Sequence, residues 1–242
     1  MTSQKLALVT GANKGIGFEI ARQIAQTGAI VLLGARNPAA GAQAAATLSG
    51  EGLTVRFLAL DVADPASVAA AAAAIARDYG HLDILVNNAG INDPADGPIA
   101  TVSLPAVERV MRTNFLGALA VTQAMLPLLL KAAAGRIVNL SSGLGSLARN
   151  AAPANPSAYT ELIGYSASKA ALNMLTVQLA YQLRDTAIKV NAAAPGFTAT
   201  DMNGHQGHQT IPEGAAEAIR LALLSDDGPT GTFSGSHGAV PW

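Results

Sequence analysis

The fold is decided by the stretch Thr10-Gly11-Ala12-Asn13-Lys14-Gly15-Ile16-Gly17, which lies between a short apolar run and a helical segment. Its glycines permit positive φ and let a ligand approach the main chain closely. The helix that begins here offers unpaired N–H groups and a positive dipole end, which suit a pyrophosphate. The spacing differs from the commonest dinucleotide fingerprint, so a tight strand-to-helix turn is the alternative. Its place after the first strand favours nucleotide binding.

Short apolar runs alternate with longer helical segments along most of the chain. The expected strands are Lys5–Thr10, Ile30–Gly34, Thr54–Leu60, Asp83–Asn87, Arg136–Leu140 and Lys189–Ala194. The expected helices are Ile16–Gln26, Ala39–Leu48, Ala66–Tyr79, Pro105–Leu130 and Tyr165–Arg184. Continuous apolar strands separated by helices indicate parallel strands buried on both faces. The prediction is an α/β fold, a single doubly wound (Rossmann) domain over residues 1–242, with a parallel sheet of about seven strands and helices on both faces.

Composition narrows the classes of function. The chain of 242 residues has a net charge of -1 and no cysteine. The neutral balance disfavours nucleic-acid binding, and the lack of thiols excludes disulfide scaffolds and cysteine nucleophiles. Mean hydropathy is +0.31, but the longest apolar run, Ala118–Leu130, is interrupted by Thr122, Gln123 and Pro127. We therefore expect a cytoplasmic protein without membrane spans or a signal segment.

The end of the second expected strand indicates which cofactor is bound. Sites that prefer NAD usually place Asp or Glu there, whereas this chain has Gly34, Ala35 and Arg36. Lys14 faces the same region from the glycine loop. Two cations without an anion favour a 2′-phosphate, so we expect NADPH/NADP+; Arg36 as a solvated turn residue is the alternative. Asp61 is either an acceptor for the adenine amino group or a loop cap.

A second group of residues indicates acid–base chemistry. Tyr165 and Lys169 are four residues apart at the start of a helical segment, so phenol and ammonium share one face. A lysine beside a tyrosine stabilises the phenolate and lowers the pKa of the phenol. Of the four tyrosines, only Tyr165 is followed four residues later by a cation.

Taken together, the motifs resemble those of the short-chain dehydrogenase/reductase family. The matching segments are Thr10–Gly17, Asn87–Gly90, Asn114–Gly117, Ser141-Ser142, Tyr165–Lys169 and Pro195-Gly196. They occur in the family's order over nearly the whole chain. Three further features resemble the carbonyl reductase branch: the sequence Gly-x-Asn-Lys-Gly-Ile-Gly at Gly11–Gly17, the ending Val240-Pro241-Trp242, and a separation of 23 residues between Ser142 and Tyr165.

The resemblance implies a role for each matching residue. Tyr165 would protonate a substrate carbonyl as NADPH delivers hydride, and Ser142 would orient that carbonyl. Lys169 would hold the nicotinamide ribose, and Asn114 would bind a water of the proton relay. Loop capping by Ser142 and a satisfied polar group at Asn114 are the structural alternatives. The residues expected to bind the cofactor are Gly11, Asn13, Lys14, Gly15, Ile16, Gly17, Arg36, Asp61, Val62, Asn88, Ala89, Gly90, Tyr165, Lys169, Pro195, Gly196, Thr198 and Thr200.

The substrate and assembly are less constrained. A loop-like insert is expected around residues 143–164, and a short loop at Asp201–Pro212 suggests an open cleft. Leu144, Leu147, Phe197 and Met202 would line that cleft for apolar carbonyl compounds. The chain is expected to form a dimer or tetramer, or to stay monomeric if the insert covers the usual interface. His205 and His208 are read as solvated loop residues rather than metal ligands, since no third ligand is apparent.

Three rival functions have sequence features against them. A catalytically silent nucleotide sensor on the same fold typically lacks the tyrosine–lysine pair. A methyltransferase leaves Tyr165 and Lys169 unexplained, and enoyl reductases usually space that pair by six residues rather than four. A dehydrogenase working mainly in the alcohol-oxidising direction remains a variant of the main prediction.

Overall fold

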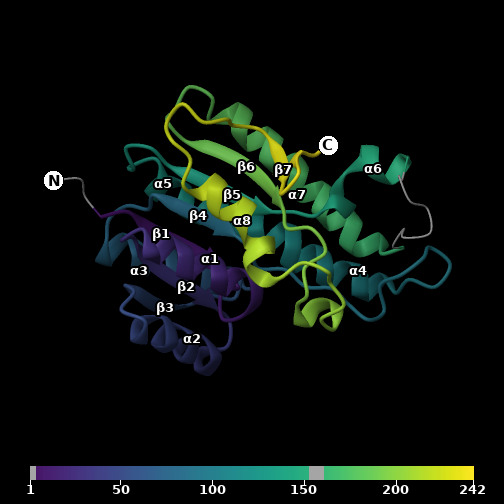
Figure 1. The fold of residues 1–242 in the computed structure, drawn as a ribbon, viewed down its shortest axis with the longest axis horizontal. Helices are drawn as coiled ribbons and strands as arrows, with labels where there is room; N and C mark the ends of the chain where they lie inside the picture. Colours follow the sequence, from purple (N-terminus) through teal and green to yellow (C-terminus); the bar gives the residue numbers. More distant parts are fainter. Residues whose placement is uncertain (1–3, 153–160) are drawn as a thin grey trace.

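The computed structural model describes residues 4–152 and 161–242, which form one eight-stranded sheet with helices on both faces (Figure 1). The strands are β1 (Leu6–Thr10), β2 (Ile30–Ala35), β3 (Val55–Ala59), β4 (Ile84–Asn87), β5 (Arg136–Leu140), β6 (Lys189–Ala194), β7 (Phe233–Gly235) and β8 (Gly238–Ala239). The α-helices are α1 (Gly15–Gln26), α2 (Pro38–Gly50), α3 (Pro65–Asp78), α4 (Leu104–Met111), α5 (Ala118–Leu129), α6 (Leu147–Ala151), α7 (Ile163–Gln182) and α8 (Ile211–Ala222). Three further helical turns are η1 (Arg112–Gly117), η2 (Gly143–Gly145) and η4 (Asp201–Asn203).

The sheet has the order β3-β2-β1-β4-β5-β6-β7-β8, and only β8 is antiparallel. The doubly wound prediction is therefore confirmed, with β7 and the two-residue β8 extending the edge. The chain moves from β1 towards β3 on one side and from β4 towards β7 on the other. This reversal between β1 and β4 opens a crevice at their carboxyl ends, where ligands bind in such folds.

Two apolar layers explain why the strands read as continuous hydrophobic runs. Ala7 and Val9 of β1 pack with α1, α2 and α8, while Leu6 and Leu8 pack with α3, α5 and α7 on the opposite face. Because alternate side chains of a strand point to opposite faces, both sets must be apolar. The sheet is therefore packed on both faces. Helices α4 and α6 lie beyond the carboxyl ends of its strands, at the right of Figure 1.

Side-chain caps mark the start of two of these helices. The Asn37 side chain accepts a hydrogen bond from Ala40 N (3.1 Å) before α2, and Asp64 accepts one from Ala66 N (2.9 Å) before α3. Each is followed by a proline, whose fixed φ suits a first helical turn. None of the helices in the described part of the chain combines the length and hydrophobicity that a bilayer span requires.

Three predicted segments differ from the structure. The single helix expected over Pro105–Leu130 is interrupted by η1, a π-helical stretch that separates α4 from α5. The insert around 143–164 is not all loop: it begins with η2 and α6, and α7 starts at Ile163; residues 153–160 lie outside the described residues. The loop expected at Asp201–Pro212 contains η4 and the first residues of α8, a helix absent from the prediction.

The C-terminal residues fold back onto the start of the insert. The Trp242 ring stacks on Phe233 of β7, with ring centroids 5.4 Å apart. The Ser146 hydroxyl donates to Pro241 O (2.6 Å), and Ala148 N donates to Trp242 O (3.0 Å). Since Ser146 also caps α6 by accepting from Arg149 N (3.1 Å), the chain end and the insert form one packed corner.

Candidate active site

The glycine loop is built for close approach at the carboxyl end of β1. Gly11 has a φ of +63°, and a Cβ there would lie 2.8 Å from Ala89 Cα, so only glycine fits. Asn88 holds the loop by donating from its amide to Thr10 O (2.8 Å) and Gly11 O (3.1 Å). The structure therefore brings the loop after β1 and the Asn88–Gly90 turn after β4 together. Lys14, the residue before α1, adds no side-chain cap to that helix.

Lys14 forms an ion pair that the sequence analysis does not predict. Its ammonium is 2.6 Å from a carboxylate oxygen of Asp201 in η4, and both side chains are more than half exposed. Asp201 also faces His205, with 2.9 Å between Nε2 and Oδ1, and Lys14 holds the pKa of the Asp201 carboxyl below its usual range. This pair joins the glycine loop to the segment after β6.

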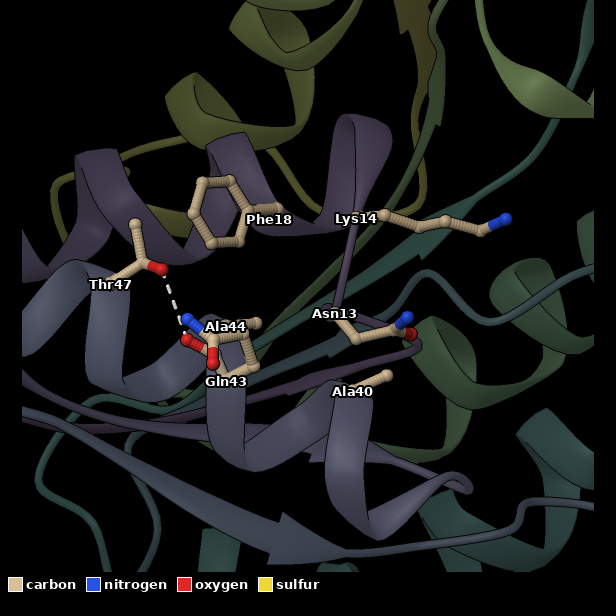
Figure 2. Close-up of a pocket in the computed structure, with 7 residues that line it drawn as sticks. All are labelled: Asn13, Lys14, Phe18, Ala40, Gln43, Ala44 and Thr47. Atoms are coloured by element: carbon tan, nitrogen blue, oxygen red, sulfur yellow. Dashed lines mark hydrogen bonds between the residues drawn. The ribbon is translucent and has the colours of Figure 1, made fainter.

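A pocket of about 450 Å³ lies next to the glycine loop, between α1 and α2. It is lined by Asn13, Lys14, Phe18, Ala40, Gln43, Ala44 and Thr47. Figure 2 shows the Lys14 side chain extending away from the end occupied by Phe18 and Thr47. Arg36, directly after β2, is exposed. Its guanidinium is therefore accessible at the end of β2, where the sequence predicts a 2′-phosphate.

Other predicted cofactor residues lie along the same edge. Asp61 Oδ1 accepts from Ala63 N (3.0 Å), which is the loop-capping alternative. Thr198 is buried and donates to Pro195 O (3.1 Å), so its hydroxyl is engaged within its own loop. Thr200 packs against the glycine loop: its Cγ2 is 4.0 Å from the position that a Cβ of Gly15 would occupy.

The four predicted catalytic residues converge beyond β4 and β5. The Lys169 ammonium lies 5.6 Å from the centre of the Tyr165 ring and donates to Leu140 O (2.7 Å). A Cβ on Gly90 would be 3.4 Å from Asn114 Oδ1 and 3.6 Å from Lys169 Nζ. These distances place Asn114 and Lys169 on the same side of Gly90, the side to which a Cβ would project.

Ser142 approaches the same centre from η2. Its hydroxyl accepts from Leu144 N (3.2 Å), which caps η2, and it hydrogen-bonds with the Tyr165 phenol. The predicted alternatives therefore coexist here: Ser142 caps its loop and also contacts Tyr165. Ser141 has another role, since it donates to Asn173 Oδ1 (2.5 Å) inside the core.

Asn114 is held within η1 at the π-helical turn. Its Oδ1 accepts from Ile91 N (2.8 Å), while its Nδ2 donates to Ile91 O (3.0 Å) and to Ser168 Oγ (3.0 Å) on α7. Segments of π-helix are rare and frequent at functional sites. The extra residue in this turn aims Asn114 between the β4 loop and α7. Asn114 therefore also fits the structural alternative, a buried polar residue whose side chain hydrogen-bonds to other residues of the protein.

Burial sets the pKa values of the pair. It raises the pKa of Tyr165, and the hydrogen bond with Ser142 opposes that rise. It lowers the pKa of Lys169 to about 8. The sequence predicts that Lys169 lowers the pKa of Tyr165; in the structure the net shift of that pKa is upwards, because removing the phenol from water disfavours the phenolate. The phenol is therefore protonated at neutral pH, as an acid must be.

Gly145 lets η2 pack against α7. A Cβ there would lie 2.7 to 2.9 Å from Lys169 backbone and Cβ atoms, so Gly145→Ala must displace the loop that carries Ser142. We expect a loss of about 1–3 kcal/mol of unfolding free energy and a reduced kcat, measured by thermal unfolding and steady-state kinetics. Gly143→Ala is the matched control, since its Cβ would meet only the movable end of Arg149, at 3.3 Å. Equal effects of the two substitutions would contradict this account.

The histidines noted in the sequence join other contacts. His205 pairs with Asp201, and the His208 ring lies 5.8 Å from the Phe197 ring. The described residues contain no group of three or more potential metal ligands. Asp96, Asn173 and Asp201 were absent from the predicted site, although they bond to it. They lie far along the chain from the motifs they support, and no local pattern marks them.

A family model described as short chain dehydrogenase matches residues 5–210, the part that contains the glycine loop and the tyrosine–lysine pair. The chain belongs to the short-chain dehydrogenase family. The NADPH carbonyl reductase 1 of Sus scrofa is 35% identical to it, covering 100% of this chain and 95% of the relative. The (-)-isopiperitenone reductase of Mentha piperita is 34% identical, covering 95% of each chain.

A solved structure of carbonyl reductase from chicken fatty liver, with NADPH bound, superposes on this chain with a TM-score of 0.86. It is 32% identical and covers 99% of both chains. The membership predicted from the ordered motifs is confirmed, and the carbonyl reductases are among the relatives of the chain.

Proposed function

We propose that this member of the family reduces ketone or aldehyde carbonyls to alcohols, reversibly, with NADPH as hydride donor. The observation that carries the proposal is the convergence of Tyr165, Lys169 and Ser142 beside the glycine loop. The relatives named as reductases support it, as does the structural neighbour that holds NADPH.

The crevice suits a dinucleotide phosphate. Gly11 leaves room beside Ala89 where a Cβ would intrude, and the start of α1 has no side-chain cap to compete with a pyrophosphate. Arg36 supplies an exposed guanidinium after β2 for a 2′-phosphate. Lys14 joins it when the phosphate displaces the Asp201 carboxylate. When bound, the cofactor supplies the hydride for the carbonyl carbon.

The residues of the chain perform the proton transfer. Tyr165, protonated because burial raises its pKa, donates its phenolic proton to the carbonyl oxygen. Ser142 donates a hydrogen bond to the same oxygen and so orients it. The ammonium of Lys169, close to the Tyr165 ring, stabilises the negative charge that develops on the phenol oxygen. Asn114 aligns the Gly90 loop and α7, on which the cofactor and the acid depend.

Apolar carbonyl compounds fit the mouth of this site best. Leu147 on α6, Phe197 after β6 and Met202 in η4 are large apolar side chains with exposed fractions of 72%, 49% and 46%. α6 and the segment after β6 both lie on the carboxyl side of strands β5 and β6, the side on which the site is formed. Turnover confined to strongly polar sugars would overturn this substrate class.

The test is NADPH oxidation across a panel of apolar ketones, aldehydes and keto esters, with the product alcohol identified by chromatography. We expect alcohol formation equal to NADPH consumed for at least one apolar carbonyl. Consumption without alcohol, or no turnover across the panel, would contradict the proposal.

Arg36→Ala tests the phosphate contact. Loss of a charge-assisted, two-point contact is expected to raise KM for NADPH by about 10- to 100-fold and to leave KM for NADH unchanged. Arg184→Ala, which removes an exposed arginine at the end of α7, is the matched control for net charge. An unaltered preference between the two cofactors would assign Arg36 to the solvated turn.

A further inference from the structure

The first turn of α7 is capped by a residue from a distant loop. Leu162, which precedes the helix, offers no side-chain cap. Asp96 supplies it instead: its Oδ1 accepts from Gly164 N (2.8 Å) and its Oδ2 from Tyr165 N (2.7 Å). Gly97 O accepts from Ile163 N (3.4 Å), so three successive N–H groups of this turn bond to two neighbouring residues of one loop.

The loop that carries Asp96 is itself fixed at several points. Its beginning is bound by Asn114, which forms two hydrogen bonds with the backbone of Ile91. Asp93 binds Arg109 on α4 (2.8 Å) and accepts from Ala95 N (3.0 Å). The Asp96 carboxylate also accepts from Gly97 N (2.9 Å). The loop therefore holds Asp96 in place, and Asp96 in turn holds the backbone of Tyr165.

We propose that Asp96 is a positioning residue for Tyr165, fixing the start of α7 and neutralising its positive end beside the phenol. The inference rests on the proposed function, because it assigns Tyr165 the role of acid. Small displacements matter for such a group, since a shift of about 1 Å in a catalytic group lowers the rate by as much as about 10²-fold. The positive end of the α7 dipole also favours the phenolate form of Tyr165. The Asp96 carboxylate counteracts this effect.

The charged groups around Tyr165 make the sign of the electrostatic effect clear. Lys169 on the same helix and Asp96 on the loop contact Tyr165 directly. The other charged residues on segments that pack against or flank α7 are all exposed: Glu108, Arg109, Arg112, Arg149 and Glu161. Removing the negative charge of Asp96 stabilises the phenolate and destabilises the ammonium. The pKa of Tyr165 and that of Lys169 both fall, so any activity limb they control moves to lower pH.

The experiment compares Asp96→Ala and Asp96→Asn with Asp93→Ala and Asp93→Asn. The Asp93 variants remove a carboxylate that also bonds to loop backbone but does not touch α7. For Asp96→Ala we expect kcat to fall at least about tenfold with KM for NADPH within about twofold. For Asp96→Asn, which keeps one acceptor oxygen, we expect a smaller fall in kcat and a pH profile displaced downwards by about half a unit. The Asp93 variants loosen the loop without removing the cap of α7, so they should lower kcat less than the matching Asp96 variants and keep the wild-type pH profile.

Amide hydrogen exchange of Gly164 and Tyr165 provides a readout without turnover. Exchange at both amides should accelerate at least about tenfold in Asp96→Ala and clearly less in Asp93→Ala, which keeps the carboxylate that binds these amides. If the wild type reduces no carbonyl with NADPH, the proposed function fails while this measurement still decides whether Asp96 holds Tyr165. Equal exchange in the two alanine variants, or an unshifted pH profile and full kcat in Asp96→Asn, would overturn the inference.

Discussion

Tyr165→Phe is expected to lower kcat for carbonyl reduction by about 10³-fold, the largest effect of any single substitution in this chain. The phenylalanine ring keeps the packing of α7, and only the proton donor is lost. Without that donor, negative charge developing on the carbonyl oxygen meets only the Ser142 hydroxyl. KM for NADPH should change little, because the contacts of the glycine loop remain.

Tyr181→Phe is the matched control. Tyr181 lies on the same helix, α7, and is 65% exposed, so its hydroxyl is away from the site. The comparison is made by single-turnover NADPH oxidation, with circular dichroism to verify folding. If Tyr165→Phe retains more than a tenth of wild-type kcat while folded, Tyr165 is not the acid.

Lys169→Met is expected to lower kcat/KM by about 10²-fold and to remove a pH dependence. Burial lowers the pKa of Lys169 to about 8, so its ammonium is present below pH 8 and is lost as the pH rises through that value. Wild-type reduction should therefore decline above pH 8. The methionine variant, which has no ammonium to lose, should show no such limb.

Methionine has a similar length and no charge to bury, so the thermal unfolding midpoint should stay close to that of the wild type. Lys131→Met, at an exposed position after α5, controls for net charge and should behave as wild type. A decline above pH 8 that persists in Lys169→Met would assign this limb to another group.

The strands and the residues of the site were predictable because each leaves a local signal. The apolar runs of β1, β2 and β4 come from burial on both faces, and the tyrosine–lysine pair follows from helical spacing. α8 also carries a signal that the prediction did not use: Thr210 and Glu213 form a capping box. β7 has only three residues in a stretch rich in glycine, serine and threonine, so its place depends on backbone bonds to β6.

The remaining features of the site are long-range. The π-helical turn at Asn114 leaves no mark in the sequence, because its benefit is the contact of one side chain with Ile91 and Ser168. The Lys14–Asp201 pair joins residues 187 positions apart. Burial reverses the expected shift in the pKa of Tyr165, since the sequence shows the neighbouring cation but not how much water the fold removes.

The tryptophan in the packed corner at the end of the chain provides an intrinsic fluorescence signal. Trp242 is the single tryptophan, so emission excited at its absorption band comes from one place, the stack on Phe233. Its backbone is bonded to Ala148 on α6, four residues after Leu144, whose amide binds Ser142. A rearrangement of the serine loop on ligand binding is thus expected to change the emission of Trp242, giving a stopped-flow signal that needs no label and no turnover.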